Sequence, residues 1–487
     1  MRKQTIQIPQ EEMDRQFDIM RKIRERNENK EKVTGRRPVA DVRTFGCQMN
    51  EHDSEKITGM LLAMGYRIKE DDQAPDLVIF NTCCVRENAE EKVYGHLGAL
   101  KKLKKDNPET VIAVCGCMTE QPTVVEEIKK KYKNVDLVFG THNLHRFPEL
   151  LKNVLDSGTR IYETSGTDNE VAEGVPVERD SKVKAWVTIM YGCDNFCTYC
   201  IVPYVRGRER SRRPEEILRE VKELEARGIK EITLLGQNVN SYGKDLRSAD
   251  GENTNGAGYM DFAGLLSYIC ENTNIPRIRF MTSHPKDLSQ RLIDTMAKYP
   301  AICRQLHLPV QSGSTRLLKM MNRRYTKEQY LELVGKVREK IPDVTLSTDI
   351  IVGFPSETEE DFEETLDVVR KVKFDMAFTF IYSKRTGTPA ATYPDQIPDD
   401  VVKDRFARLL DAQNKNTHDS NVKHIGETLE VLAEGQSRTN EDKYTGRTQG
   451  GKPVNFTAEE DVTGKMVLVK ITGGQTWYLE GEYVRDV

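Results

Sequence analysis

Three cysteines lie close together in the string YGCDNFCTYC, at Cys193, Cys197 and Cys200, with the spacing C-x3-C-x2-C. Structural zinc sites usually add a second cysteine pair or a histidine pair, and neither follows here. Three thiolates can instead hold a cubane iron–sulfur cluster with one iron left open to bind and reduce a substrate. The spacing favours such a cluster, with a zinc site or unrelated cysteines as the alternatives. Tyr199, inside the loop, is a candidate to pack against a bound purine.

A second set of cysteines is dispersed: Cys47 in TFGCQMNEHDSE, Cys83 in IFNTCCVRE and Cys117 in AVCGCMTEQ. Each follows a predicted strand, and the carboxyl ends of strands in an open parallel sheet line one crevice. Three such loops can bring three thiolates together. The alternative is that all three are ordinary buried cysteines, which are common.

The other four cysteines are expected to be bystanders. Cys115 lies at the end of a strand and should point into the core, whereas Cys84 should face away from its neighbour Cys83. Cys270 and Cys303 lack any such context.

The apolar pattern predicts three folded regions and two connecting segments. Residues 1–37, with 11 Lys or Arg and 7 Asp or Glu, are predicted to form a mobile or loosely helical N-terminal arm. Residues 38–156 alternate strands and helices, as in a doubly wound parallel α/β domain. Residues 157–181 are polar and are predicted to be a linker. Residues 182–421 show six strand–helix units, typical of a partial (β/α)6 barrel, and 422–487 resemble a small all-β barrel.

These regions are assigned from short apolar runs that predict strands. In the first domain the expected strands are Val39–Phe45, Leu77–Asn81, Val111–Val114 and Leu137–Phe139, with helices near 51–64, 88–105 and 120–132. The barrel strands are expected at Trp186–Met190, Glu231–Leu235, Arg277–Met281, Gln305–Leu308, Thr345–Ile351 and Met376–Tyr382. The last region has candidate strands at Thr428–Leu432, Lys443–Gly446, Lys465–Ile471 and Trp477–Val484.

Composition limits the classes of protein that this chain can be. It has 487 residues, of which 37% are hydrophobic and 31% charged. No apolar run approaches the roughly 18 residues that span a bilayer, and the start has no apolar signal-peptide core. We therefore expect a cytoplasmic protein without a membrane partner, in which ten cysteines do not form a disulfide framework. The net charge of −4 gives no global attraction to nucleic acid.

A local basic run follows the first cysteine loop. The string RGRERSRR at 206–213 holds five arginines and one glutamate. Arginine pairs with phosphates and stacks on bases, so these side chains are candidate RNA contacts: Arg206, Arg208, Arg210, Arg212 and Arg213. The alternatives are an ordinary solvated run or charges that hold the barrel edge.

The cysteine patterns carry a family resemblance. C-x3-C-x2-C with an aromatic residue before the last cysteine resembles the signature of radical S-adenosylmethionine (SAM) enzymes, and the two triads together resemble the methylthiotransferases over about residues 38–487. The matching strings are GCQMNEHDSE, FNTCCVRE, CTYCIVPYVRGRERSR, LLGQNVNSYG, TSHP, LHLPVQSGS, TDIIVGFPSETEEDF and YSKRTGTPAA. The departures are Tyr191, where arginine is frequent, Cys84, and the first 37 residues.

The resemblance implies an enzyme that methylthiolates C-2 of N(6)-isopentenyladenosine beside the anticodon, at position 37 of tRNA. It implies two 4Fe–4S clusters, an auxiliary one on Cys47, Cys83 and Cys117 and a radical SAM cluster on the other triad. Of two SAM molecules, one donates a methyl group and the other yields a 5′-deoxyadenosyl radical. The implied partners are the isopentenylated anticodon stem-loop, an electron-donor protein and an iron–sulfur or sulfur carrier, and we expect a monomer.

The same resemblance implies where SAM and RNA bind. Loops at the carboxyl ends of the barrel strands supply the candidate SAM contacts Gly236, Gln237, Asn238, Ser283, His284, Gln311, Ser312 and Asp349, although polar loop residues often only cap helices. The C-terminal region resembles the RNA-binding TRAM module, with Arg438, Lys443, Arg447, Phe456 and Trp477 as possible contacts. Its 7 Lys or Arg against 11 Asp or Glu after residue 423 argue against binding by charge alone.

Two kinds of alternative stay open. The same chemistry could act on threonylcarbamoyladenosine in tRNA or on an aspartate of a ribosomal protein. A different class would be a non-catalytic, zinc-containing RNA-binding protein. The sequence contains no Walker phosphate loop, HExxH or GxSxG motif, which agrees with chemistry at a C–H bond that side-chain acids and bases cannot reach.

Overall fold

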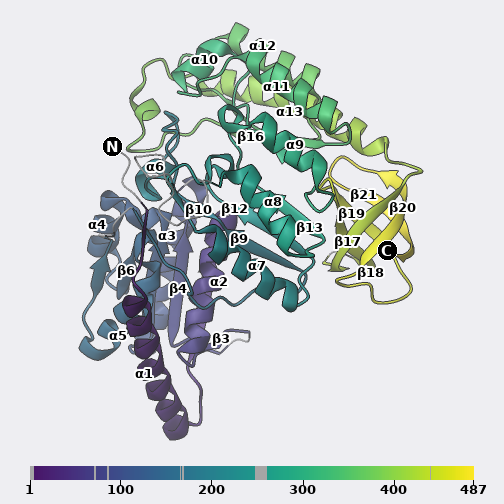
Figure 1. The fold of residues 1–487 in the computed structure, drawn as a ribbon. Coiled ribbons are helices and arrows are strands. Elements are labelled where there is room, and N and C mark those ends of the chain that lie inside the picture. Colours follow the sequence, from purple (N-terminus) through teal and green to yellow (C-terminus); the bar gives the residue numbers. More distant parts are fainter. Residues whose placement is uncertain are drawn as a thin grey trace. The chain divides into compact units, whose positions relative to one another are not determined.

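The computed structural model describes residues 5–70, 73–84, 87–164, 166, 169–246, 260–438 and 440–487 (Figure 1). The chain forms two compact units. Unit 1 comprises residues 1–180, 190–194 and 201–212, and unit 2 comprises residues 181–189, 195–200 and 213–487. The chain therefore passes from one unit to the other within the Cys193–Cys200 loop. None of the described helices is long and apolar enough to cross a membrane.

Unit 1 is built on a six-stranded parallel sheet with the order β3-β2-β4-β5-β6-β7. The strands are β2 (Val39–Thr44), β3 (Arg67–Ile68), β4 (Leu77–Thr82), β5 (Val111–Gly116), β6 (Leu137–Phe139) and β7 (Ile161–Glu163). The helices are α2 (Gln48–Ala63), α3 (Glu87–Asp106), α4 (Pro122–Lys131) and α5 (Phe147–Ser157). All six residues of β4 and of β5 are buried, as expected for central strands covered on both faces.

Apolar side chains on the two faces of this sheet form separate cores. Leu77 and Ile79 of β4 belong to a core with residues of α2 and α5. Val78 and Phe80 belong to a second core with residues of α3 and α4. Because successive strand residues point to opposite faces, helices cover both faces of the sheet. The predicted doubly wound domain is confirmed.

The N-terminal arm differs from the prediction. Residues Gln10–Thr34 form one continuous helix, α1, whose buried positions alternate by three and four: Met13, Gln16, Met20, Ile23 and Asn27. This spacing gives a single buried seam. Two of these five buried residues are polar, so the sequence lacks a regular helical pattern of apolar residues. Both are satisfied, because Gln16 donates to Glu12 (2.8 Å) and Asn27 to the Met64 carbonyl (2.9 Å).

The segment predicted as a linker also folds in part with unit 1. Strand β7 pairs with β6 at the edge of the large sheet, and β8 (Glu170–Val171) pairs with β1 (Ile6–Gln7). These strands are only two or three residues long, too short to leave an apolar pattern in the sequence.

Unit 2 contains six parallel strands in chain order. They form two sheets, β13-β12-β9 and β14-β15-β16, and an isolated bridge between Ile278 and Ile302 links their neighbouring edges. The strands are β9 (Lys184–Thr188), β12 (Glu231–Leu235), β13 (Arg277–Phe280), β14 (Gln305–His307), β15 (Thr345–Val352) and β16 (Met376–Ile381). The helices include α7 (Pro214–Ala226), α8 (Phe262–Asn272), α9 (Gln290–Lys298), α10 (Thr315–Met320), α11 (Lys327–Lys340), α12 (Glu359–Val372) and α13 (Asp399–Val422). The predicted partial barrel is confirmed.

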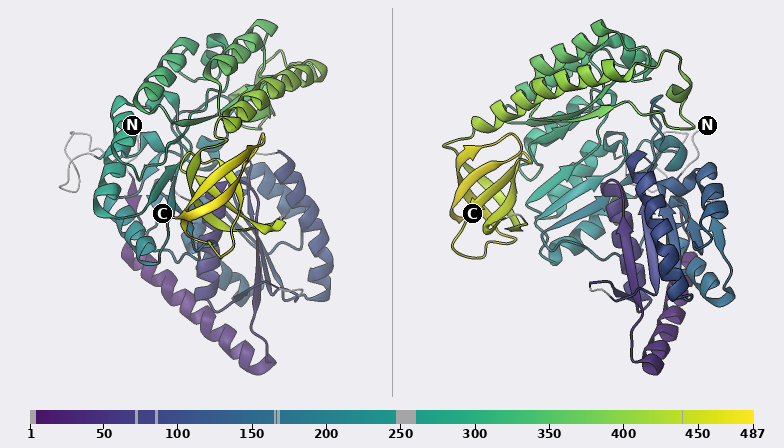
Figure 2. Two further views of the ribbon diagram at one scale, coloured as in Figure 1. Left: turned by 90° about the vertical axis from the view of Figure 1, so that its right-hand side faces the viewer. Right: turned by 180° about the vertical axis from the view of Figure 1, so that it is seen from behind.

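The C-terminal region is a closed five-stranded barrel with the order β17-β18-β19-β21-β20 (Figure 2). Its strands are β17 (Thr428–Ser437), β18 (Asn440–Thr448), β19 (Pro453–Thr457), β20 (Met466–Gly474) and β21 (Leu479–Asp486). Strand β19, which begins at a proline, was not predicted. Phe456 is fully buried in the barrel core, the more common position for an aromatic residue in such a barrel, so it is not an RNA contact, whereas Trp477 is 60% exposed.

Buried arginines connect this small barrel to the strands of unit 2. Arg277 donates to the Arg447 carbonyl (2.7 Å) and pairs with Glu430 (2.9 Å). Arg279 donates to the carbonyls of Thr448 (2.6 Å) and Gln449 (2.9 Å). Both side chains start from β13, so the amino-terminal part of that strand anchors the C-terminal barrel.

The seam of α1 makes a prediction about stability. Ile23→Ala should lower the free energy of unfolding by about 2–5 kcal/mol, because the side chain is 2% exposed and its loss leaves a cavity. Val33→Ala on the same helix is the control, since Val33 is 86% exposed, and it should change stability by less than about 0.5 kcal/mol. Urea-induced unfolding measures both. Equal, small effects would mean that α1 is not packed on the core.

Candidate active site

Three cysteines of unit 1 follow neighbouring strands. Cys47 follows β2 and precedes α2, Cys83 follows β4 directly, and Cys117 follows β5. From β2 the chain first goes to β3 on one side and then returns to β4 on the other. This reversal creates the crevice in which open α/β sheets usually bind ligands. Cys47 and Cys83 flank that crevice.

The Asn50 side chain lies between two of these thiols. Its Oδ1 atom is 3.6 Å from the Cys47 sulfur and 4.0 Å from the Cys117 sulfur. Its Nδ2 atom donates to the Thr82 carbonyl (2.8 Å), the residue before Cys83. One buried amide therefore contacts two of the thiols and the end of the strand that precedes the third cysteine.

Glycines allow the cysteine loops to come this close. Gly46 has φ +134°, and a Cβ there would lie 2.5 Å from the Cβ of Cys83. Gly116 has φ +99°, and a Cβ there would lie 2.3 Å from the Thr82 carbonyl oxygen. Any other residue would be strained by conformation and by contact. Each of these glycines directly precedes a predicted cluster cysteine.

The three thiols are not arranged for a single ion. Among the described residues, no group of three His, Cys, Asp or Glu side chains is close enough to hold one metal ion. A cubane cluster is larger than one ion, so the thiolates that hold it lie farther apart than the ligands of a single ion. Thiolates are the ligands that iron–sulfur clusters take.

The cysteines of this chain differ in their burial and in their contacts. Cys115 is buried in the core with α2 and α5, as predicted. Cys84 is buried and shares a hydrogen bond with Cys117, and this bond, helped by the charge of Arg206, lowers the pKa of Cys117 to about 7. Cys117 is thus prepared to be a thiolate at neutral pH. Cys303 is buried and Cys270 half-buried.

The arginine run does not form one exposed surface. Arg206, Arg210 and Arg212 are 4%, 5% and 7% exposed, so the prediction that they contact RNA is corrected. Arg212 pairs with Glu173 (2.6 Å), and Arg210 lies over the Tyr191 ring. Only the remaining two are exposed: Arg208, which pairs with Asp194 (3.0 Å), and Arg213.

Each part of the C-x3-C-x2-C loop is held by contacts within its own unit. In unit 1, the Cys193 amide donates to the Gly207 carbonyl (3.1 Å). In unit 2, Asn322 donates to the carbonyls of Asn195 and Phe196 (3.1 and 3.0 Å), and Arg323 lies 3.6 Å from the Cys197 sulfur. The Thr198 hydroxyl donates to the Met320 carbonyl (3.0 Å). Asn322 and Arg323 were not predicted as site residues, because neither belongs to a recognisable sequence motif.

Polar atoms without partners gather at the carboxyl ends of the strands of unit 2. These atoms are buried and have no hydrogen-bond partner among the described residues: Gln237 Oε1, Asn238 Oδ1, Ser283 Oγ, His284 Nε2 and Gln311 Oε1. All five residues were predicted to contact SAM. Buried polar groups are rarely left unpaired, so these atoms fit a bound polar ligand. Thr282 and Gln311 also adopt left-handed backbone conformations, with φ of 66° and 68°, which is typical of functional loops.

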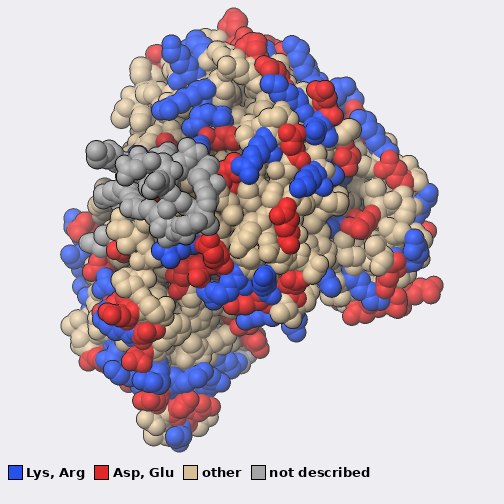
Figure 3. Space-filling model, in the orientation of Figure 1, with Lys and Arg blue, Asp and Glu red and all other residues tan. Residues whose placement is uncertain are grey.

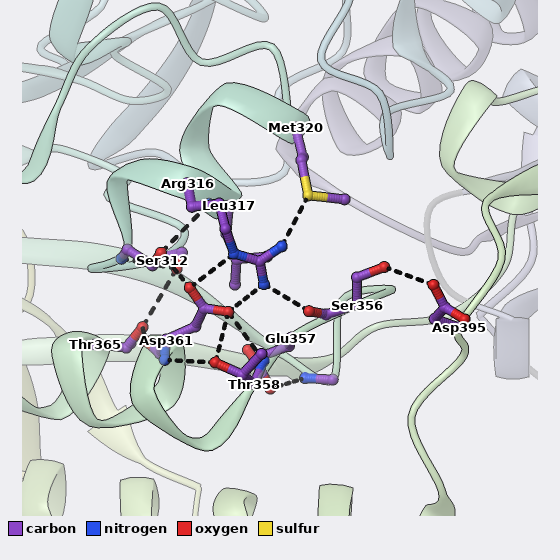
Figure 4. Close-up of polar contacts among 12 residues, drawn as sticks. Ser312, Arg316, Leu317, Met320, Ser356, Glu357, Thr358, Asp361, Thr365 and Asp395 are labelled. Carbon is purple, nitrogen blue, oxygen red and sulfur yellow. Dashed lines mark hydrogen bonds and ion pairs between the residues drawn. The ribbon is translucent and has the colours of Figure 1, made fainter.

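Other predicted SAM contacts already have partners within unit 2. The Ser312 hydroxyl contacts Thr365 (3.3 Å) and accepts from the Ser314 amide, within the polar network that joins α10 to α12 (Figure 4). Asp349 lies 3.4 Å from His307 Nε2, and the Gly236 carbonyl accepts from the Thr282 hydroxyl. Ser312 therefore has a structural role. Tyr199 packs against an apolar core that includes Leu317, Met321 and Phe354.

Comparisons with known proteins agree with this architecture. Residues 187–369 match the radical SAM superfamily, residues 40–140 match the uncharacterized protein family UPF0004, and residues 422–484 match the TRAM domain. A protein of Acetivibrio thermocellus is 57% identical over 483 residues, which cover 99% of this chain and 98% of that protein. A protein of Clostridioides difficile is 51% identical over 486 residues, the full length of both. Each is named a tRNA-2-methylthio-N(6)-dimethylallyladenosine synthase.

A solved structure shares the fold. The radical SAM methyltransferase TsrM from Kitasatospora setae, with cobalamin and a 4Fe–4S cluster bound, superposes with a TM-score of 0.52. The match covers 72% of this chain and 74% of that one at 15% sequence identity. At this identity the likeness concerns the fold alone.

The glycine before Cys117 makes a prediction about cluster binding. Gly116→Ala should displace the Cys117 loop and reduce the iron bound after anaerobic reconstitution from about eight toward about four per chain. Gly95→Ala is the control, because Gly95 lies in α3 and a methyl group added there would have no neighbour within 4 Å, so this variant should bind iron normally. Full iron content in both variants would contradict the role given to Gly116.

Proposed function

The chain belongs to the family of tRNA-2-methylthio-N(6)-dimethylallyladenosine synthases, radical SAM enzymes that methylthiolate tRNA, and we propose which of its residues serve that activity. Cys47, Cys83 and Cys117 hold the auxiliary 4Fe–4S cluster. Cys193, Cys197 and Cys200 hold the cluster that binds SAM. The observation that carries the first assignment is the gathering of three cysteine loops around the Asn50 amide, at neighbouring strand ends.

Cys83, and not its neighbour Cys84, is proposed as the second auxiliary ligand. Strands β4 and β5 pair with Thr82 opposite Gly116, so the next residues, Cys83 and Cys117, leave the sheet at the same level. Cys83 also lies against Gly46, beside the Cys47 loop. These positions support Cys83 as the member of the triad.

When bound, the two clusters and SAM supply one-electron chemistry that reaches an unactivated C–H bond such as adenine C-2. The chain's own contribution is to bind and orient. His284 Nδ1 accepts a hydrogen bond from the Lys286 amide (3.2 Å), which leaves the ring proton on Nε2. Burial and the nearby Arg323 and Lys286 charges hold the His284 pKa well below its usual range, so the ring stays neutral. We propose that its Nε2–H donates to SAM.

Three partners follow from the chemistry. The substrate is the isopentenylated anticodon stem-loop of tRNA; an electron-donor protein supplies the reducing electron, and an iron–sulfur or sulfur carrier restores the auxiliary sulfur. We propose that the enzyme works as a cytoplasmic monomer. The family name favours dimethylallyladenosine over threonylcarbamoyladenosine or a ribosomal protein as substrate, and membership of an enzyme family disfavours a non-catalytic zinc protein.

Four exposed arginines and one half-buried lysine are the proposed tRNA contacts. In unit 1 this is Arg208. In unit 2 they are Arg213, Arg438 and Arg447, which are exposed, and Lys443, which is half-buried. Lys443 lies 3.6 Å from Glu480, and Arg447 lies 3.4 Å from Glu434. These acidic side chains partly neutralise the two positive charges. Acidic and basic side chains alternate over the face seen in Figure 3. Phosphate binding is therefore expected at separate basic side chains and not on one basic patch.

The adjacent cysteines give a sharp test of the site. Cys83→Ala should still convert SAM to 5′-deoxyadenosine but form no 2-methylthio-N(6)-isopentenyladenosine, because only the auxiliary cluster is lost. Cys84→Ala should keep both activities. Mass spectrometry of 5′-deoxyadenosine and of digested tRNA from complemented deletion cells measures them. Loss of methylthiolation in Cys84→Ala with retention in Cys83→Ala would assign the ligand to Cys84 instead.

Salt dependence tests the RNA contacts. If Arg213 binds a phosphate, Arg213→Ala should weaken tRNA binding and reduce the slope of log affinity against log salt by about one. Arg219→Ala is the control, because Arg219 is exposed nearby on α7 but pairs with Glu216 and Glu223. Filter binding at several salt concentrations measures the slope. Equal slopes for Arg213→Ala and the unmodified enzyme would remove Arg213 from the interface.

A further inference from the structure

Arg206 is the arginine whose position departs most from the sequence expectation. Its guanidinium is buried in unit 1 and directed at three groups. Nε donates to the Cys117 sulfur (3.0 Å), Nη2 donates to Asn50 Oδ1 (3.1 Å), and Nη1 pairs with Asp53 Oδ2 (2.8 Å). A residue in this position cannot reach a phosphate at the surface.

The surroundings fix this guanidinium in place. Asn50 and Asp53 lie one turn apart on α2, the helix that begins just after Cys47. On the other side, Ile201 and Val205 of the arginine's own segment pack with Cys84 and Cys117. The planar fork of arginine satisfies an amide, a carboxylate and a thiol together, which a lysine cannot do.

Burying a guanidinium is unfavourable unless its charge is compensated. Asp53 supplies one negative charge, and its side chain is 7% exposed. The second anionic partner would be the Cys117 thiolate, at 3.0 Å from Nε. The site is thus built so that a positive charge and an N–H donor face one sulfur of the triad, and the Asn50 Oδ1 atom accepts from both Arg206 Nη2 (3.1 Å) and the Cys47 thiol (3.6 Å).

We propose that Arg206 is a positioning residue of the auxiliary cluster that raises its reduction potential. This inference rests on the proposed function, in which Cys47 and Cys117 hold that cluster. One-electron reduction adds one negative charge to the cluster and its thiolates. A fixed positive charge and an N–H···S hydrogen bond stabilise that added charge, and such contacts are known to set cluster potentials. Removing them should favour the oxidised form.

The test is an anaerobic redox titration of the full chain, with reduction by dithionite followed by electron paramagnetic resonance. The Cys193→Ala/Cys197→Ala/Cys200→Ala background removes the other cluster, so that only the auxiliary signal is titrated. At a fixed applied potential, Arg206→Met should lower the ratio of reduced to oxidised cluster about tenfold, which is about 59 mV for a one-electron couple. Arg208→Met is the matched control, because Arg208 is exposed and pairs with Asp194, and it should leave the potential unchanged.

A second variant predicts the opposite sign. Asp53→Asn keeps the guanidinium but removes its counter-charge, so the potential should rise. This variant also decides the question if Arg206→Met fails to retain a cluster. A raised potential in Asp53→Asn supports the proposal, and an unchanged potential overturns it. Wild-type potentials in both variants would likewise overturn it.

Cys117→Ala in the same background separates this inference from the proposed function. The variant should bind no cluster. If a cluster persists, the ligand assignment itself is wrong, whatever the arginine variants show. If the cluster is lost in Cys117→Ala but Arg206→Met and Asp53→Asn both titrate like their parent, the ligand assignment stands and the role of Arg206 is rejected.

Discussion

The common direction of the strands is the constraint on which the rest of this structure depends. Parallel strands deliver every following loop to the same edge of a sheet. In unit 1 this brings the loops after β2, β4 and β5 together, although their cysteines are 34 to 70 residues apart in the sequence. In unit 2 it gathers the loops after β12, β13 and β14, which carry the unpaired polar atoms of Gln237, Ser283 and Gln311. A cluster or SAM needs several ligating or polar side chains close together, and the common strand direction brings the loops that carry them to one edge of each sheet.

Each cysteine triad also has a buried arginine close to one sulfur. Arg206 lies 3.0 Å from Cys117, and Arg323 lies 3.6 Å from Cys197. Arg323 is fixed much as Arg206 is, since it donates to the Tyr325 hydroxyl (2.9 Å) and the Pro309 carbonyl (2.7 Å). Two buried guanidinium groups would be unfavourable in an ordinary core. Beside the thiolates of the proposed clusters, both guanidinium charges would be compensated.

Local patterns in the sequence were enough to predict most strands, because a central parallel strand contains a short continuous apolar run, such as residues 77–80 of β4. The cysteine loops were predictable for the same reason, since their places follow from the strand ends. The seam of α1 was not, because Gln16 and Asn27 occupy two of its buried positions. The arginine run was misread because the partners of Arg206 and Arg212 are Asp53 and Glu173, far away in the chain. Composition cannot tell a solvated charge from one paired at long range.

The most direct test measures how much iron each cysteine triad binds. Iron and acid-labile sulfide, with Mössbauer spectra, would be measured on the anaerobically reconstituted chain and on two triple variants, Cys47→Ala/Cys83→Ala/Cys117→Ala and Cys193→Ala/Cys197→Ala/Cys200→Ala. We predict about eight irons in the parent and about four in each variant, with different spectra for the two remaining clusters. If either variant kept all its iron, or lost all of it, the assignment of two independent clusters to these two triads would be contradicted.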